Sequence, residues 1–178
     1  MGLIFQFCGL SGAGKTTLAN ALSNELQAKG YRVKVIDGDV YRQTLCKDLG
    51  FSRADRIENV SRLGIYAASL RDEFDFIFIA AINPYKEGRE VVRRSCSAKL
   101  VWIKCKIEIL INRDTKGLYH KALLPDGHPD KIYNLTGLND VFEIPVAADL
   151  VIDTDLLSIE DSLLAAIDFM VGDLMLDL

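Results

Sequence analysis

The stretch GLSGAGKTT at residues 9–17 decides how the rest of the chain is interpreted. It follows an apolar run at residues 3–8 that predicts a buried strand. It leads into a segment where Leu18, Leu22 and Leu26 recur every four residues, as on a helix. Glycine weakens strands and helices alike, so its three glycines indicate main chain that turns tightly or approaches a ligand closely. The order strand, glycine loop, helix therefore predicts a phosphate-binding loop.

This loop matches the pattern G-x-x-x-x-G-K-[ST] from Gly9 to Thr16. In that pattern backbone N–H groups and the helix N-terminus hold phosphates, the lysine reaches the outer ones, and the hydroxyl binds Mg²⁺. The alternative is a glycine-rich turn that only caps a helix. The residues expected to hold a nucleotide are Gly12, Ala13, Gly14, Lys15, Thr16 and Thr17.

The composition restricts the class of protein. With 178 residues, 49% of them hydrophobic and 26% charged, the chain predicts one globular domain over 1–178. A net charge of −4 argues against a nucleic-acid or membrane surface, and we expect neither as a partner. The first apolar run ends at residue 8, too early for a signal peptide or a membrane span. The four cysteines form no C-x-x-C pair, so we expect buried free thiols in a cytoplasmic protein.

Strand-like and helical patterns alternate along the chain. The strand-like runs lie at 3–8, 31–36, 74–80, 99–104 and 149–152, and the helical patterns near 16–29, 54–71, 86–96, 106–113 and 158–176. This alternation predicts an α/β fold of three layers, a parallel sheet of about five strands with helices on both faces. Ligands in such sheets bind beyond the carboxyl ends of the strands. Four segments should therefore meet around one crevice: 9–17, 37–42, 81–89 and 113–116.

Residues 114–145, which we call the lid segment, show little regular periodicity and are rich in glycine and proline. A long irregular stretch inside a compact domain is typically functional, and often covers a site. The alternative is an excursion with no such role.

Several absences and one acidic turn point to a kinase. The chain has no N-K-x-D run to select guanine and no second hydrolysis module, which disfavours a GTPase and a motor. The strand at 74–80 is not followed by an acidic residue, so the carboxylate linked to Mg²⁺ should come from Asp37-Gly38-Asp39. We expect Thr16, Asp37 and Asp39 near the metal, Asp39 at the acceptor hydroxyl, and Arg42 on an anionic acceptor. The alternative is a surface turn with a solvated arginine.

The helix expected from residue 54 starts with a capping signal. Ser52 fits the N-cap and Asp55 its N3 position. Arg56, Asn59 and Arg62 would then share a face at i, i+3 and i+6, and offer cations and an amide to a phosphate-bearing substrate. The ring before the cap, at residue 51, fits either a hydrophobic staple or a platform for a base.

Six segments in the same order resemble the adenylylsulfate kinase family, P-loop enzymes that use MgATP to phosphorylate the 3′-hydroxyl of adenosine 5′-phosphosulfate (APS). The resemblance covers residues 3 to about 155. Its segments are GLSGAGKTT at 9–17, DGDVYR at 37–42, LGFSRADRIEN at 49–59, the NP-x4-R run at 83–89, RDTKGLY at 113–119 and LTGLND at 135–140.

The resemblance implies a role for each matching residue. Lys15, Asp39 and Lys116 would be catalytic, Arg113 would lie near the adenine of ATP, and the lid segment would close over both ligands. The implied acceptor-binding residues are Asp39, Arg42, Phe51, Arg56, Asn59, Ile82, Asn83, Lys116 and Leu135.

The chain departs from the family on the acceptor side. Leu135 stands where the family has a phenylalanine that stacks on the acceptor's adenine, and Asn83 stands where it has a serine. The usual proline-tyrosine pair is Val141-Phe142 here. An alternative is thus the same transfer to another nucleotide-linked acceptor, such as the cytidine diphosphate derivative cytidine diphosphoramidate. A nucleotide-binding regulatory module without catalysis is a further alternative, although the retained Lys15 and Asp39 argue against it.

The C-terminal helical pattern carries a broad apolar stripe. We expect this stripe to pack on the sheet, and a homodimer surface is the alternative. The stretch 170–178 stays apolar almost to its end. The residues of the stripe are Leu156, Ile159, Leu163, Ile167, Met170 and Leu174.

Overall fold

The computed structural model describes residues 1–174. Within them one sheet is built from β1 (Leu3–Cys8), β2 (Val33–Asp37), β3 (Phe76–Ala80), β4 (Lys99–Lys104) and β5 (Leu150–Asp153). The strand order is β2-β3-β1-β4-β5, and each neighbouring pair is parallel. The predicted five-stranded parallel sheet is confirmed.

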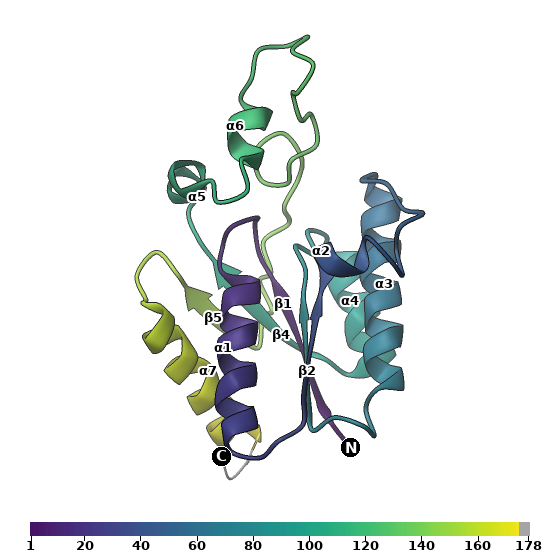
Figure 1. Cartoon of the computed structure of the whole chain (residues 1–178), viewed down its shortest axis with the longest axis vertical. Helices are drawn as coiled ribbons and strands as arrows, with labels where there is room; N and C mark the ends of the chain where they lie inside the picture. Colours follow the sequence, from purple (N-terminus) through teal and green to yellow (C-terminus); the bar gives the residue numbers. More distant parts are fainter. Residues whose placement is uncertain (175–178) are drawn as a thin grey trace.

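Helices cover both faces of the sheet (Figure 1). On one face lie α1 (Lys15–Ala28) and α7 (Ile159–Leu174), and on the other α3 (Arg53–Ser69) and α4 (Lys86–Cys96). The recurring leucines Leu18, Leu22 and Leu26 bury the inner side of α1, as their period predicts. The three-layer prediction is therefore confirmed.

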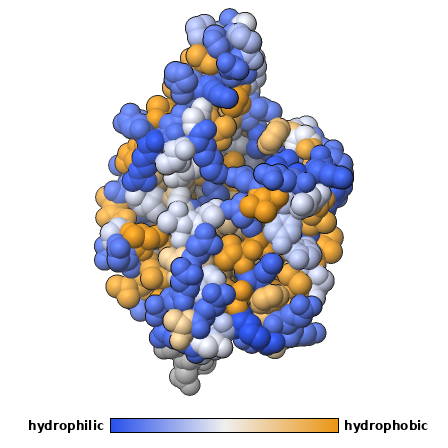
Figure 2. Space-filling view, viewed as in Figure 1, coloured by the Kyte–Doolittle hydropathy of each residue, from blue (hydrophilic) through white to orange (hydrophobic). Residues whose placement is uncertain are grey.

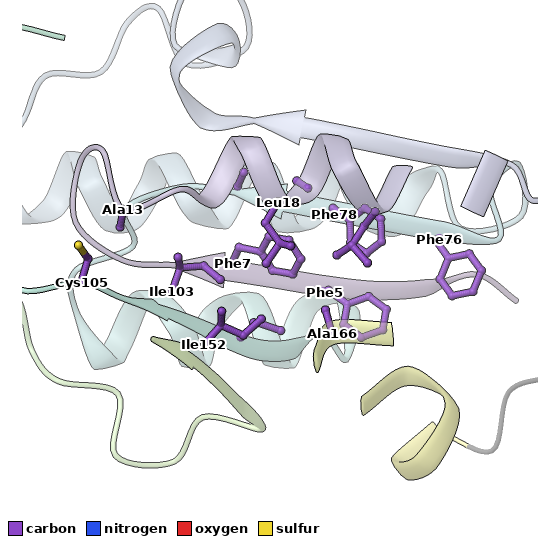
Figure 3. Close-up of a cluster of buried hydrophobic side chains, with 14 of the residues drawn as sticks. Phe5, Phe7, Ala13, Leu18, Phe76, Phe78, Ile103, Cys105, Ile152 and Ala166 are labelled. Atoms are coloured by element: carbon purple, nitrogen blue, oxygen red, sulfur yellow. The ribbon is translucent and has the colours of Figure 1, made fainter. Parts of the chain in front are cut away.

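Aromatic side chains fill the centre of the sheet, and they are almost completely buried. Phe5 and Phe7 on β1 pack against Phe78 on β3, with the ring centroids of Phe7 and Phe78 5.5 Å apart (Figure 3). All four cysteines are buried and unpaired, as predicted. Because β1 is the middle strand and is packed on both sides, the glycine loop that follows it starts from a rigid base.

Two strands start two residues later than the sequence pattern predicts, and β5 starts one residue later. Gly30 N–H and Tyr31 N–H donate to the carbonyls of Gln27 and Leu26 at the end of α1, so β2 begins at Val33 and not at residue 31. Phe74 N–H donates to a carbonyl of the turn after α3, so β3 begins at 76. In both cases the helix cap uses the backbone groups that a strand would need.

The structure adds two short helices that the sequence pattern does not predict. The first is α2 (Gly38–Tyr41), which the Asp37 carboxylate caps by accepting from Asp39 N–H at 2.8 Å. The second is α6 (Leu118–Ala122), which lies in the lid segment beyond α5 (Ile107–Arg113). Figure 1 shows α6 and the loops around it extending past the carboxyl edge of the sheet.

The C-terminal stripe is only partly buried. Met170 is buried and Leu163 and Ile167 pack against the core, whereas Leu156 lies in the turn before α7, 79% exposed, and Ile159 is 40% exposed. These two side chains are therefore not part of the buried stripe. Figure 2 shows apolar side chains on the side where α7 lies and hydrophilic ones over the tip of the lid segment. The predicted apolar end from residue 175 on lies outside the described residues.

Among the described residues, no helix is both long and apolar enough to cross a membrane.

Candidate active site

The glycine loop after β1 needs backbone that only glycine adopts easily. Gly9 has φ +149°, and a Cβ there would lie 2.3 Å from the Ile103 carbonyl oxygen. Gly14 has φ +102° and is the N-cap of α1. The loop therefore turns back over its own strand and places the N-terminus of α1 at the carboxyl edge of the sheet.

Lys15 is the cation of this loop, and its side chain is nearly enclosed. Its Nζ donates to the Leu10 carbonyl at 2.7 Å, and the residue is 9% exposed. Burial lowers the pKa of Lys15 to about 8, while the nearby Asp39 carboxylate acts in the opposite direction. A charge held with so little water favours an anion beside it.

Thr16 and Asp37 bring two oxygen ligands together. The Thr16 hydroxyl donates to Asp37 Oδ2 at 2.6 Å, and the other carboxylate oxygen caps α2. Hydroxyl and carboxylate oxygens are the ligands that Mg²⁺ prefers. This donor set fits the predicted metal position at the ends of β1 and β2.

Asp39 on α2 and Lys116 in the lid segment form an ion pair across the mouth of the site. The Asp39 carboxylate accepts from Lys116 Nζ, and both side chains are at least half exposed. The pair therefore connects the lid segment to the acidic turn that follows β2.

One cavity of about 510 Å³ joins these groups to the expected acceptor residues. The predicted site residues that line it are Gly12, Gly14, Lys15, Thr16, Thr17, Asp37, Asp39, Arg42, Phe51, Arg56, Ile82, Lys116 and Leu135. Asn59 and Asn83 line a smaller cavity of about 60 Å³ that shares Arg42, Phe51 and Arg56 with the large one.

Two arginines and a ring lie together in the wall of the cavity, where the acceptor is expected to bind. The Arg42 guanidinium carbon lies 4.5 Å from the Phe51 ring centroid, and that of Arg56 lies 5.4 Å from it. Arg42 Nη1 donates to the Gly50 carbonyl and Arg56 Nε to the Phe51 carbonyl. Burial and the neighbouring Arg56 lower the pKa of Arg42. Two cations this close favour an anionic ligand.

The start of α3 confirms the capping box of Ser52 and Asp55. Phe51 is 52% exposed and its ring contacts the cation of Arg56, the N4 residue, so it does not form an apolar staple. Its exposed ring in the cavity wall fits the other alternative, a surface for a base.

Arg62 is not part of the site. Its guanidinium binds Asp48 at 2.6 Å and Glu58 at 2.8 Å, outside both cavities. Six residues turn a helix by about 600°, so position i+6 points well away from position i. The prediction that Arg62 shares the face of Arg56 and Asn59 is therefore wrong.

Two predicted nucleotide residues lie outside the cavity lining. Ala13 is 1% exposed and its methyl group faces the core, so only its backbone is available to a ligand. Arg113 ends α5 and donates to the Thr154 carbonyl at 3.3 Å. Its placement near the adenine of ATP stays a prediction.

Asn83 and Leu135 both serve the fold. Asn83 has φ +42°, and its Nδ2 donates to Gln6 Oε1, while Gln6 Nε2 donates to the Arg89 carbonyl. Leu135 is 6% exposed and belongs to the core cluster, although it also borders the cavity. Leu135 therefore adds no polar group to the acceptor site, whereas the Asn83 side-chain oxygen Oδ1 is buried without a hydrogen-bond partner and Asn83 lines the smaller cavity.

Sequence reasoning missed part of the lining. Five of these residues belong to the lid segment: Thr115, Leu118, Ile132, Asn134 and Thr136. Thr115, Leu118 and Thr136 lie within the motifs at 113–119 and 135–140, whereas the only signal for the other two is their position in the lid segment. Arg89 is also structural, since it donates to the carbonyls of Asn83, Pro84 and Glu143 and so holds the loop after β3.

Comparisons with known proteins find similar sequences and similar folds. The family model described as adenylylsulphate kinase matches residues 1–153. The adenylyl-sulfate kinase of Chloroflexus aurantiacus is 45% identical over 171 residues, which cover 94% of this chain and 89% of that protein. Among solved structures, the Mycobacterium tuberculosis APS kinase CysC in complex with AMPPNP and APS is 34% identical. It superposes with a TM-score of 0.89 over 96% of this chain and 98% of that one. A hexameric APS kinase from Thiobacillus denitrificans, 28% identical, has a TM-score of 0.71 over 97% of this chain and 29% of that one.

Proposed function

Because this chain belongs to the adenylyl-sulfate kinase family, we propose that it transfers the γ-phosphoryl group of ATP to the 3′-hydroxyl of APS. The products are 3′-phosphoadenylylsulfate and ADP. The observation that carries the proposal is a single cavity lined by Lys15 of the P-loop, by Asp39, and by Arg42 and Arg56. Such a site can hold two anionic ligands with a carboxylate beside them, as phosphoryl transfer requires.

The P-loop side would hold ATP. Backbone N–H groups at the start of α1 and the buried charge of Lys15 face the phosphates, where the low local dielectric strengthens the attraction. The Thr16 hydroxyl and the Asp37 carboxylate would hold Mg²⁺, which neutralises charge on the transferring group.

The other side would hold APS. Arg42 and Arg56 lie where they can bind its anionic phosphosulfate, and the exposed Phe51 ring can stack on its adenine. In this arrangement the Asp39 carboxylate takes the proton of the 3′-hydroxyl. The oxygen of that hydroxyl bonds to the γ-phosphorus, while the bond between the γ-phosphorus and the oxygen of the ADP leaving group breaks. When Asp39 becomes protonated, the Lys116 ammonium would instead stabilise the negative charge on the transferring phosphoryl group.

In this proposal the whole chain forms one kinase domain, and its lid segment closes over both substrates. Closure excludes water, which would otherwise compete with the 3′-hydroxyl as acceptor. The buried unpaired thiols fit a cytoplasmic enzyme. A homodimer through α7, where Leu164 is 58% and Val171 40% exposed, is a prediction that sedimentation velocity would test.

The test is ADP release from MgATP by the purified chain, measured with APS and separately with cytidine diphosphoramidate. We expect APS to give the higher kcat/KM, since the relatives are adenylyl-sulfate kinases and do not favour the cytidine alternative. The Asp39→Asn variant should still bind ATP but lose at least about a hundredfold in kcat, the range of general base catalysis. No APS-dependent ADP release by the wild-type chain would overturn the proposal, and full activity of the variant would remove Asp39 from the chemistry.

A further inference from the structure

Asp140, near the end of the lid segment, forms an ion pair with the Arg56 guanidinium. Arg56 Nη2 lies 3.3 Å from Asp140 Oδ2, in a site where the arginine side chain is 7% exposed and the aspartate 22%. The same Nη2 donates to the Asn134 carbonyl at 2.6 Å, and Nε donates to the Phe51 carbonyl at 3.0 Å. Within residues 1–174 the hydrogen bonds and the ion pair of Arg56 therefore use Nε and Nη2, which leaves Nη1 for a ligand in the cavity.

The Asp140 carboxylate is itself held in place. Its Oδ1 accepts from Val141 N–H at 2.8 Å and lies 3.5 Å from the Tyr85 hydroxyl at the start of α4. Its carbonyl accepts from Gly137 N–H at 2.8 Å, which closes the turn of the lid segment. One carboxylate oxygen is thus fixed by the surrounding backbone, and the other faces Arg56.

This contact joins parts of the chain that are far apart in sequence. Arg56 is on α3, whereas Asp140 and Asn134 belong to the lid segment. A charge-assisted contact that is largely shielded from water is stronger and more directional than one on the surface. If Asp140 is removed, the buried Arg56 cation loses its charged partner, and its guanidinium group can move more freely.

We propose that Asp140 is a positioning residue for the acceptor. Asp140 orients the guanidinium of Arg56 toward the anionic group of APS. Because Asp140 belongs to the lid segment, this orientation depends on the lid segment being packed against α3. The inference rests on the proposed function, because it assumes that Arg56 binds the acceptor. It differs from a purely structural anchor, which would affect both substrates alike.

The experiment compares Asp140→Ala and Asp140→Asn with a matched control, Asp126→Ala. Asp126 is another carboxylate of the lid segment, 90% exposed and 3.2 Å from Lys131. For each variant we would measure kcat, the KM for APS, the KM for ATP and the Tm. We expect Asp140→Ala to raise the KM for APS about tenfold and to leave the KM for ATP unchanged, while the Tm falls because the buried Arg56 cation loses its charged partner. Asp140→Asn keeps a single acceptor oxygen, which can face either Arg56 Nη2 or Val141 N–H but not both, so it should raise the KM for APS less than Asp140→Ala does. The control should stay within about threefold of the wild type.

A second background tests whether Asp140 acts through Arg56. In the Arg56→Lys variant, which lacks the planar fork, Asp140→Ala should change the KM for APS less than twofold. A full tenfold effect there would overturn the inference, and so would an Asp140→Ala chain with a wild-type KM for APS. Equal losses for ATP and APS would mean a structural anchor only. A wild-type chain that releases no ADP with APS would instead overturn the proposed function, and this inference with it.

Discussion

Lys15 carries its charge where little water reaches it, and two features of its surroundings shift its pKa in opposite directions. Burial disfavours the ammonium, whereas the carboxylate of Asp39 favours it. The pKa of about 8 leaves the lysine mostly protonated near neutral pH and able to lose its proton a little above it. A bound polyphosphate would favour the charged form further.

This pKa predicts how ATP use depends on pH. The kcat/KM for ATP should fall above pH about 8, because free enzyme with a neutral Lys15 lacks its contact with the outer phosphates. The kcat should fall only at higher pH, because bound ATP holds the proton on the lysine. Initial rates from pH 6.5 to 9.5, at saturating APS, would measure both. A kcat/KM that stays level up to pH 9.5 would contradict the assigned role of Lys15.

At the scale of elements, the lid segment and the P-loop meet at one close contact. Gly137 has φ +89°, and a Cβ there would lie 2.5 Å from Leu10 Cδ2. Leu10 also supplies the carbonyl that holds Lys15 Nζ. Leu10 therefore contacts the lid segment through its side chain and holds Lys15 of the phosphate loop through its carbonyl group.

Replacing Gly137 should affect both substrates. In Gly137→Ala the left-handed backbone costs roughly 1–2 kcal/mol, and the new methyl group must displace Leu10 or the lid segment. We expect the KM for ATP and the KM for APS to rise several-fold. Gly127→Ala is the matched control, since Gly127 has φ +84° in the same segment but a Cβ there would meet no atom within 4 Å. If both variants behave alike in steady-state kinetics, the contact with Leu10 has no role.

For the whole molecule, the site is assembled from the carboxyl ends of β1, β2 and β3, from the start of α3 and from the lid segment. Each contributor is anchored separately, the strands in the aromatic core and the lid segment through its contacts with α3 and α4. A ligand that contacts several of them should stabilise the fold as a unit.

Binding should therefore appear in thermal unfolding. MgADP at one hundred times its Kd contributes about 2.7 kcal/mol, which corresponds to a rise of roughly 5–10 °C in Tm for a chain of this size. Differential scanning calorimetry with and without MgADP would measure the shift. EDTA should reduce it, and Lys15→Ala should nearly abolish it. The same shift in that variant would show that the nucleotide binds elsewhere.

Much of the fold was predictable because it follows from local patterns. The runs at 3–8, 99–104 and 86–96 match β1, β4 and α4 to the residue, since apolar period and flanking turns are properties of short segments. The short helix α2 was not predictable, because its four residues are too few for a period and depend on the cap from Asp37. The prediction for Arg62 was wrong for a local reason, because position i+6 of a helix points well away from position i, and its guanidinium binds Glu58 and Asp48 instead.

By itself, the sequence determined the parallel sheet, the phosphate loop and the residue types at the site, because each is encoded within a few neighbouring positions. Only the tertiary structure decided which of those residues meet: Lys116 with Asp39, and Asp140 with Arg56. Both pairs join the lid segment to helices more than seventy residues earlier in the chain. Such contacts depend on how separate elements pack around one core, and no local pattern of residues carries that information.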